Sequence, residues 1–165
     1  MKIEERGDQF IIVDFNEREA YTIACRIEEE GIRFYGKLLE AVADPQAKGV
    51  IEHLIREERR HLAFFTECLS VLEEGGDEGF EEDTLLKNID FGIFQPYEAM
   101  GDLGQIVDNL KKALRLGIAV ENKSIQLYET CQGRISDPAT REELKRIACE
   151  EAKHAAALEK ILNAV

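Results

Sequence analysis

The sequence predicts an all-α protein, a four-helix bundle made of two repeated helix pairs joined by a long crossover connection. Four long segments carry apolar residues at steps of three and four, the spacing of one helix face. An Asp-Pro pair interrupts each half of the chain, and a glycine-containing segment separates the halves. A chain of 165 residues suffices for one core, so we expect a single domain over residues 1–165.

The first helix pair is bounded by residues that favour helix ends. Asn16 can cap the first helix, which we expect to reach about Ala43. Asp44 then interrupts the pattern and can cap a second helix that has Pro45 in its first turn. We expect this second helix to run to about Glu74, where two glycines follow.

The second helix pair follows a crossover connection predicted over residues 75–104. The third helix is expected over about residues 105–135, and Asp137-Pro138 opens a fourth that runs nearly to Val165. If the second and third helices are parallel, the connection returns along a bundle of about 38 Å, the length of about 25 helical residues. No helical segment alternates with period two, so we expect almost no strand, and residues 1–15 form an N-terminal extension.

Each predicted inward face is apolar except at its middle, where ionisable residues lie. These residues repeat: Glu121 follows Glu28 by 93 residues, and Tyr128 follows Tyr35 by the same distance. Two E-x-x-H motifs and both Asp-Pro pairs obey the same offset, which indicates an internal duplication of a helix pair. The repeated ionisable positions are Glu28, Glu58, His61, Glu121, Glu151 and His154.

Buried carboxylates at one level of a bundle need compensating charge, because each costs several kcal/mol to desolvate. Two E-x-x-H helices plus one glutamate from each of two further helices form the ligand set of carboxylate-bridged di-iron and di-manganese sites. A lone E-x-x-H motif in a glutamate-rich helix is usually a solvated face, but here both motifs and both single glutamates fall on apolar seams. The sequence therefore predicts a dinuclear metal site.

The composition excludes several other classes of protein. With 34 acidic and 21 basic residues the net charge is -13, which opposes binding to nucleic acid or anionic membranes. No apolar run approaches the roughly 20 residues of a membrane span, and the N-terminus does not resemble a signal peptide, so we expect a cytoplasmic protein. The cysteines are scattered and are expected to be thiols, most simply buried small hydrophobes: Cys25, Cys68, Cys131 and Cys149.

Four motifs also carry a family resemblance. R-I-E-E-E-G-I-R-F-Y at 26–35, E-E-R-R-H at 57–61, A-V-E-N-K-S-I-Q-L-Y at 119–128 and E-E-A-K-H at 150–154 resemble the ferritin-like domain of rubrerythrins. The resemblance implies that Glu58 and Glu151 bridge two iron ions. It implies Glu28 and His61 as further ligands of one ion, and Glu121 and His154 as those of the other. Tyr35 and Tyr128 would each donate a hydrogen bond to the glutamate of the opposite half.

The chain departs from the rubrerythrin pattern at two points. Ser124 stands where rubrerythrins carry an additional metal-site glutamate, which puts redox-linked iron movement in doubt. The chain also lacks a rubredoxin-like four-cysteine domain, so electrons are expected from a separate donor protein such as a rubredoxin or a reductase.

The leading functional expectation is a non-haem di-iron oxidoreductase, a homodimer that reduces hydrogen peroxide, or dioxygen, to water. The same ligands also suit manganese in place of iron. One alternative is a ferroxidase or iron-binding protein for storage or detoxification, which assembly into a hollow shell of many subunits would favour. Another is a purely structural bundle, which would hold no metal.

Overall fold

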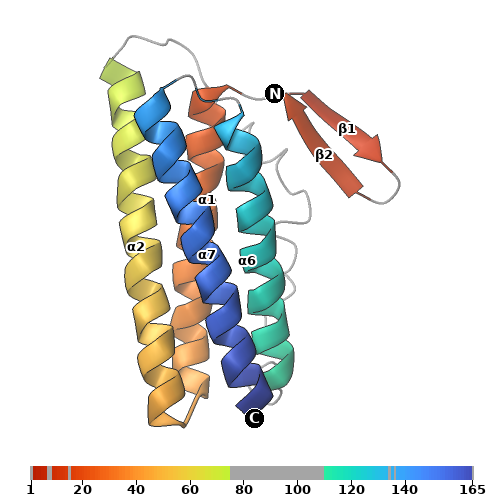
Figure 1. Ribbon diagram of the computed structural model, residues 1–165, viewed down its shortest axis with the longest axis vertical. Coiled ribbons are helices and arrows are strands. Elements are labelled where there is room, and N and C mark those ends of the chain that lie inside the picture. The colour runs from red at the N-terminus through yellow and green to blue at the C-terminus, as the bar shows by residue number, and fades with distance from the viewer. Residues whose placement is uncertain are drawn as a thin grey trace.

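The computed structural model describes residues 2–6, 9–14, 16–74, 110–133, 135 and 137–164. Its four long helices lie side by side in one bundle (Figure 1), which confirms the predicted all-α fold. The predicted crossover connection and the expected start of the third helix lie outside the described residues. The helices are α1 (Glu17–Ala41), α2 (Pro45–Glu74), α6 (Leu110–Gln132) and α7 (Pro138–Ala164).

The bundle consists of two antiparallel helix pairs. α1 packs mainly against α2 and α6 mainly against α7, while α1 also contacts α6 and α2 also contacts α7. As Figure 1 shows, α2 and α6 run in the same direction, as the long connection predicts. The repeat is visible in the starts of α2 and α7, because Pro138 follows Pro45 by 93 residues.

Side-chain caps fix three of the helix starts. The Asn16 side chain accepts a hydrogen bond from the Glu19 backbone N–H at 2.8 Å, and the Glu19 carboxylate accepts one from the Asn16 N–H at 2.9 Å. Asp44 accepts from the backbone N–H of Ala47 at 2.7 Å, and Asp137 accepts equivalently from Thr140 at 2.7 Å. The two Asp-Pro pairs therefore start α2 and α7 in the same way.

Two helices end earlier than the sequence predicts. α1 ends at Ala41, and the backbone of Val42 is already extended, with ψ 130°. Two residues later, Pro45 disfavours a helical backbone at Asp44, so the helix could not have continued much further. α6 stops at Gln132, where Gly133, a poor helix former, bonds back to Thr130. Ile135 remains buried beyond the helix end, and its N–H donates to the Cys131 carbonyl at 3.1 Å.

The N-terminal extension contains the only strands among the described residues. β1 (Lys2–Arg6) pairs antiparallel with β2 (Gln9–Asp14), with Glu4 opposite Ile11 and a register shift after Lys2. The expectation of almost no strand therefore holds for the four helical segments and fails for this extension. Its run F-I-I-V is rich in residues that favour strands.

The apolar core is divided into two clusters by the layer of ionisable residues. One cluster contains Ile23 and Ile27 of α1, and the other contains Phe34 and Leu38 of the same helix, so Glu28 lies between them. At Gly117 of α6 a Cβ would lie 2.9 Å from the Phe34 ring and 3.0 Å from Leu158, so only glycine allows this close approach. The ionisable layer is thus enclosed by close packing on both sides.

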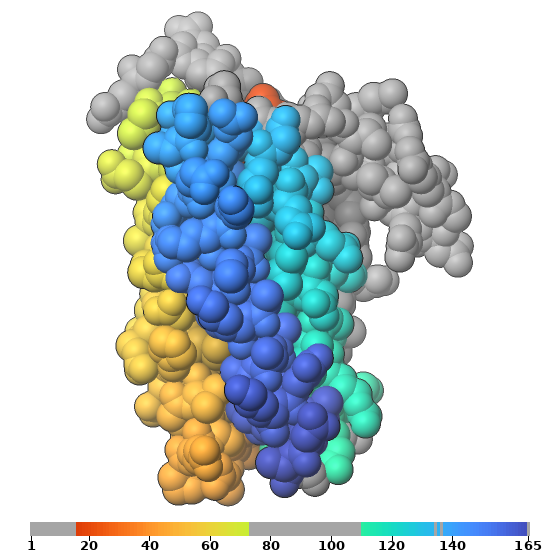
Figure 2. All heavy atoms as spheres, in the orientation of Figure 1, coloured from red at the N-terminus to blue at the C-terminus, as the bar shows by residue number. Residues whose placement is uncertain are grey.

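Burial follows the predicted inward faces closely. The residues at steps of three and four along α1 and α6 are buried: Tyr21, Ala24, Glu28, Gly31, Tyr35 and Leu38 on α1, and Leu114, Gly117, Glu121, Ser124, Tyr128 and Cys131 on α6. On α2 the face becomes half-buried at Cys68. Figure 2 shows one outer face of the bundle, where α7 lies between α2 and α6 and its side chains cover the interior.

Candidate metal centre

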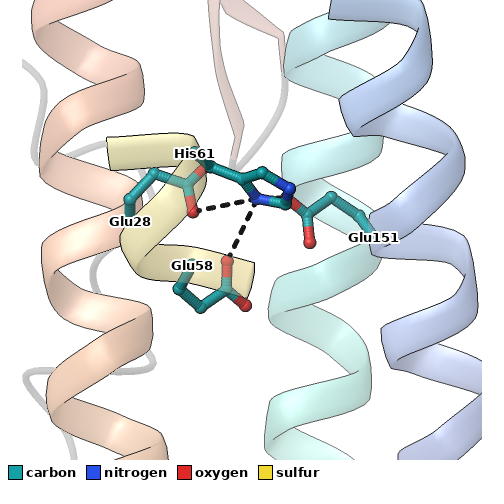
Figure 3. Close-up of side chains that lie close together, drawn as sticks. All are labelled: Glu28, Glu58, His61 and Glu151. Carbon is teal, nitrogen blue, oxygen red and sulfur yellow. Dashed lines mark ion pairs between the residues drawn. The ribbon is translucent and has the colours of Figure 1, made fainter. Parts of the chain in front are cut away.

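Six ionisable side chains meet in the middle of the bundle. They come from all four helices, and none is more than 3 % exposed, although isolated charges are rarely buried in this way. Figure 3 shows four of them, with Glu28 from α1, Glu58 and His61 from α2, and Glu151 from α7 directed toward one another. The complete set is Glu28, Glu58, His61, Glu121, Glu151 and His154.

The six side chains form two groups of four, each with one potential ligand atom per residue and all these atoms within 4.8 Å of one another. Glu28 and His61 belong to one group, and Glu121 and His154 to the other. Glu58 and Glu151 belong to both groups. A carboxylate has two oxygens, so each shared glutamate can offer one oxygen to each group.

Both imidazoles direct Nδ1 toward the carboxylates. The Nδ1 atom of His61 lies 3.0 Å from Glu151 Oε1 and 3.4 Å from Glu58 Oε2. The Nδ1 atom of His154 lies 2.8 Å from Glu151 Oε2 and 3.3 Å from Glu58 Oε1. The two rings stack at a centroid distance of 5.9 Å.

Although they lie close together, several of these buried atoms make no hydrogen bond of acceptable geometry. They are Nδ1 of His61, Nδ1 of His154 and both carboxylate oxygens of Glu151. Buried polar atoms are almost always hydrogen-bonded, because an unsatisfied one costs roughly 1–3 kcal/mol. Imidazole nitrogens and carboxylate oxygens are ligands for iron and manganese, so these unsatisfied atoms fit a pair of divalent cations.

Without metal, the charges in this layer perturb one another strongly. Burial, reinforced by Glu58 and Glu151, raises the pKa of Glu28 well above its usual value. Burial also opposes ionisation of Glu58, but the two neighbouring histidines lower its pKa to about 2. Burial disfavours a charged His154, yet Glu151 and Glu58 raise its pKa to about 11. Metal ligation at Nδ1 displaces the proton held there, so metal affinity must fall as the pH is lowered.

Two buried tyrosines link the halves of the bundle. Tyr35 of α1 donates a hydrogen bond to Glu121 Oε1 on α6, and Tyr128 of α6 donates one to Glu28 Oε1 on α1. Burial, with the nearby charge of Glu28, raises the pKa of Tyr128 far above its usual value, so its hydroxyl remains a donor. Each tyrosine therefore orients one carboxylate that belongs to a single group.

A small cavity opens onto this layer, with space for about one water-sized molecule. All four carboxylates line it, and neither histidine does. The other lining residues also form pairs at the 93-residue offset, so the cavity lies on the axis that relates the two halves. The pairs are Ile27 with Val120, Glu28 with Glu121, Gly31 with Ser124, and Glu58 with Glu151.

The family comparison agrees with this arrangement. A family model of rubrerythrin matches residues 5–69 and, in a second overlapping match, residues 19–162. The chain belongs to the rubrerythrin family. Membership in this family, together with the buried carboxylate and imidazole cluster, indicates iron binding. No curated protein and no solved structure matches the chain.

Ser124 occupies the position at which rubrerythrins were expected to carry a further glutamate. Its hydroxyl donates a hydrogen bond to the Val120 carbonyl at 3.2 Å.

The sequence did not identify three of the cavity-lining residues as functional positions: Ile27, Gly31 and Val120. The 93-residue offset could have found them, because Gly31 is the equivalent of Ser124 and Ile27 that of Val120.

The cysteines lie outside this cluster. Cys131 is buried, and burial raises its pKa to about 12, as expected of an unreactive core thiol. Cys25 and Cys68 are half-buried, and burial raises the pKa of each to about 11. Cys149 is exposed, so the expectation that every cysteine is buried is wrong. Cys149 lies two residues before Glu151, and at about 100° per residue its side chain leaves α7 about 200° around the helix axis from that of Glu151.

No helix in the described ranges is long and apolar enough to cross a membrane.

Proposed function

We propose that this chain is a di-iron oxidoreductase that reduces hydrogen peroxide to water. The observation that carries the proposal is the pair of four-residue groups that share Glu58 and Glu151, with a small cavity beside them. Glu28 and His61 would complete the ligands of one iron, and Glu121 and His154 those of the other. Two ferrous ions hold the two electrons that, with two protons, convert one peroxide molecule into two waters.

The protein's own contribution is orientation and exclusion of water. Tyr35 and Tyr128 hold the unshared carboxylates in place through hydrogen bonds across the bundle. The apolar clusters on both sides restrict solvent around the reacting atoms. The cavity has room for a small oxidant and excludes an organic substrate of ordinary size.

Electrons would return from a separate donor protein, such as a rubredoxin or a reductase. This donor, dioxygen as a second oxidant, the homodimeric assembly and the cytoplasmic location are expectations drawn from the sequence and its family resemblance. Manganese remains the alternative metal, since carboxylate and imidazole ligands suit both.

Rapid mixing of the ferrous-loaded protein with peroxide and, separately, with dioxygen tests this function. We expect peroxide to oxidise the centre at least about tenfold faster than dioxygen, and a reductant to restore the ferrous form for further turnovers. A ferroxidase would show the reverse preference and would deposit ferric mineral as more Fe(II) is supplied. That result, combined with a large hollow assembly in light scattering, would replace the peroxidase proposal with an iron-storage function.

A further inference from the structure

The two halves of the centre differ in what supports the histidine. The Nε2 atom of His61, which faces away from the six-residue cluster, lies 3.0 Å from Glu150 Oε2. A carboxylate only accepts, so Nε2 keeps its proton and donates it, and Nδ1 is the nitrogen that gives up its proton to bind a metal ion. Among the described residues, no side chain makes the equivalent contact with His154 Nε2.

The 93-residue repeat would predict the same support in both halves. Glu57 is the equivalent of Glu150, so it is the residue expected to accept from His154. Its ion-pair partner in the described chain is instead Arg60, at 3.0 Å on its own helix. The carboxylate is present in both halves, but only Glu150 contacts the histidine of the opposite half.

Two substitutions between the halves explain this difference. Arg146 of α7 donates from Nη1 to Glu150 Oε1 at 2.7 Å, which turns the other oxygen of Glu150 toward His61. The equivalent position in the first half is His53, which is exposed and makes no such contact in the described chain. Position 60 is arginine and its equivalent, 153, is lysine; Arg60 reaches across to Glu150, and the lysine has no corresponding contact among the described residues.

Arg60 does not cancel the effect of Glu150 on the imidazole. Its Nη2 lies 3.3 Å from His61 Nε2, but both nitrogens approach the same oxygen of Glu150. Its side chain is 40 % exposed, so solvent screens its charge. His61 Nε2 itself lies in a fully buried side chain, where the hydrogen bond to a carboxylate is strong.

We infer that Glu150 is a positioning residue that makes the two metal positions unequal, so that the group of Glu28 and His61 binds a divalent ion more tightly than the group of Glu121 and His154. A carboxylate behind a metal-bound histidine fixes its tautomer and orientation and raises its basicity; losing such a partner typically costs roughly 10–100-fold in metal affinity. The inference rests on the dinuclear site of the proposed function and adds an order of filling to it.

Calorimetric titration of the metal-free protein with Co(II), which air does not oxidise, tests the inference without any catalytic assay. We expect two equivalents to bind in two resolved steps. Glu150→Ala should weaken the tighter step by roughly 10–100-fold. Glu57→Ala, the matched change at the equivalent position, should leave both steps unchanged. Arg146→His, which copies the first half, should weaken the tighter step in the same direction but less, and Glu150→Gln, which retains an accepting oxygen, should recover part of the loss.

The variants also separate positioning from general stability. Glu150 forms ion pairs with Arg60 and Arg146 near the surface, so its loss should lower the melting temperature only slightly. Two equal steps in the original chain, or equal effects of Glu150→Ala and Glu57→Ala, would overturn the inference while leaving a dinuclear site intact. Fewer than two equivalents bound by the original chain would overturn the dinuclear site itself and the inference with it.

Discussion

Replacing Glu58 by alanine is expected to slow peroxide reduction by more than roughly 100-fold, since even partners of metal ligands typically contribute 10–100-fold. Glu58 belongs to both four-residue groups, so its loss removes one ligand from each metal position at once. His154→Ala should affect one position and should lower the metal content from two ions per chain toward one. Metal analysis and peroxide turnover, measured on the same preparations, check both expectations.

Matched variants on the same helix control for these changes. Glu52 and His53 are exposed on α2, so Glu52→Ala and His53→Ala should retain two metal ions and full turnover. Because a buried alanine could disturb folding, Glu58→Gln, which keeps the side-chain volume, should show the same loss of metal with an unchanged circular dichroism spectrum. Full peroxide turnover in Glu58→Ala would show that the ligand assignment is wrong.

The second large effect is expected at the cavity. A Cβ at Gly31 would lie 3.7 Å from Glu58 Cδ, an ordinary contact, so Gly31→Ala should fold normally and bind two metal ions. Its methyl group would nevertheless occupy part of a space that holds about one water-sized molecule. We expect peroxide oxidation of the ferrous protein to slow by roughly 10–100-fold, the loss that a small misplacement of a reactant can cause.

Gly36→Ala is the matched control for this prediction. It lies five residues later on α1, and an added Cβ there meets nothing within 4 Å. Both variants should gain helix stability, by up to about 1 kcal/mol from propensity alone. Stopped-flow rates equal to those of the unaltered protein in Gly31→Ala would mean that the oxidant does not use this cavity.

The sequence alone predicted the elements that rest on periodicity and repetition. The inward faces depend only on apolar spacing, and the offset of 93 residues related the two Asp-Pro starts and the ionisable layer. The exact ends of the helices were harder to predict. Apolar spacing continues to the buried Ile135, but α6 ends at Gln132 because Gly133 is a poor helix former. The hairpin before Asn16 is built from short strands, for which sequence patterns give a weak signal.

The contact between His61 and Glu150 could not be predicted from the repeat. Strict repetition places a glutamate near the Nε2 atom of both histidines. The two halves differ in whether a second residue binds the other oxygen of that glutamate and so holds the carboxylate toward the histidine. Arg146 provides the anchor in one half, and His53 does not in the other. Such a contact between α2 and α7 depends on side-chain conformations that spacing does not specify.

One chain is expected to hold two metal ions that share Glu58 and Glu151. Mössbauer and electron paramagnetic resonance spectra of the protein, loaded anaerobically with ⁵⁷Fe(II) and then oxidised with peroxide, test it most directly. We expect two irons per chain and a spin-coupled diferric pair without a paramagnetic resonance signal, since bridging carboxylates couple the two ions. A single iron per chain, or the resonance of isolated ferric ions, would contradict it.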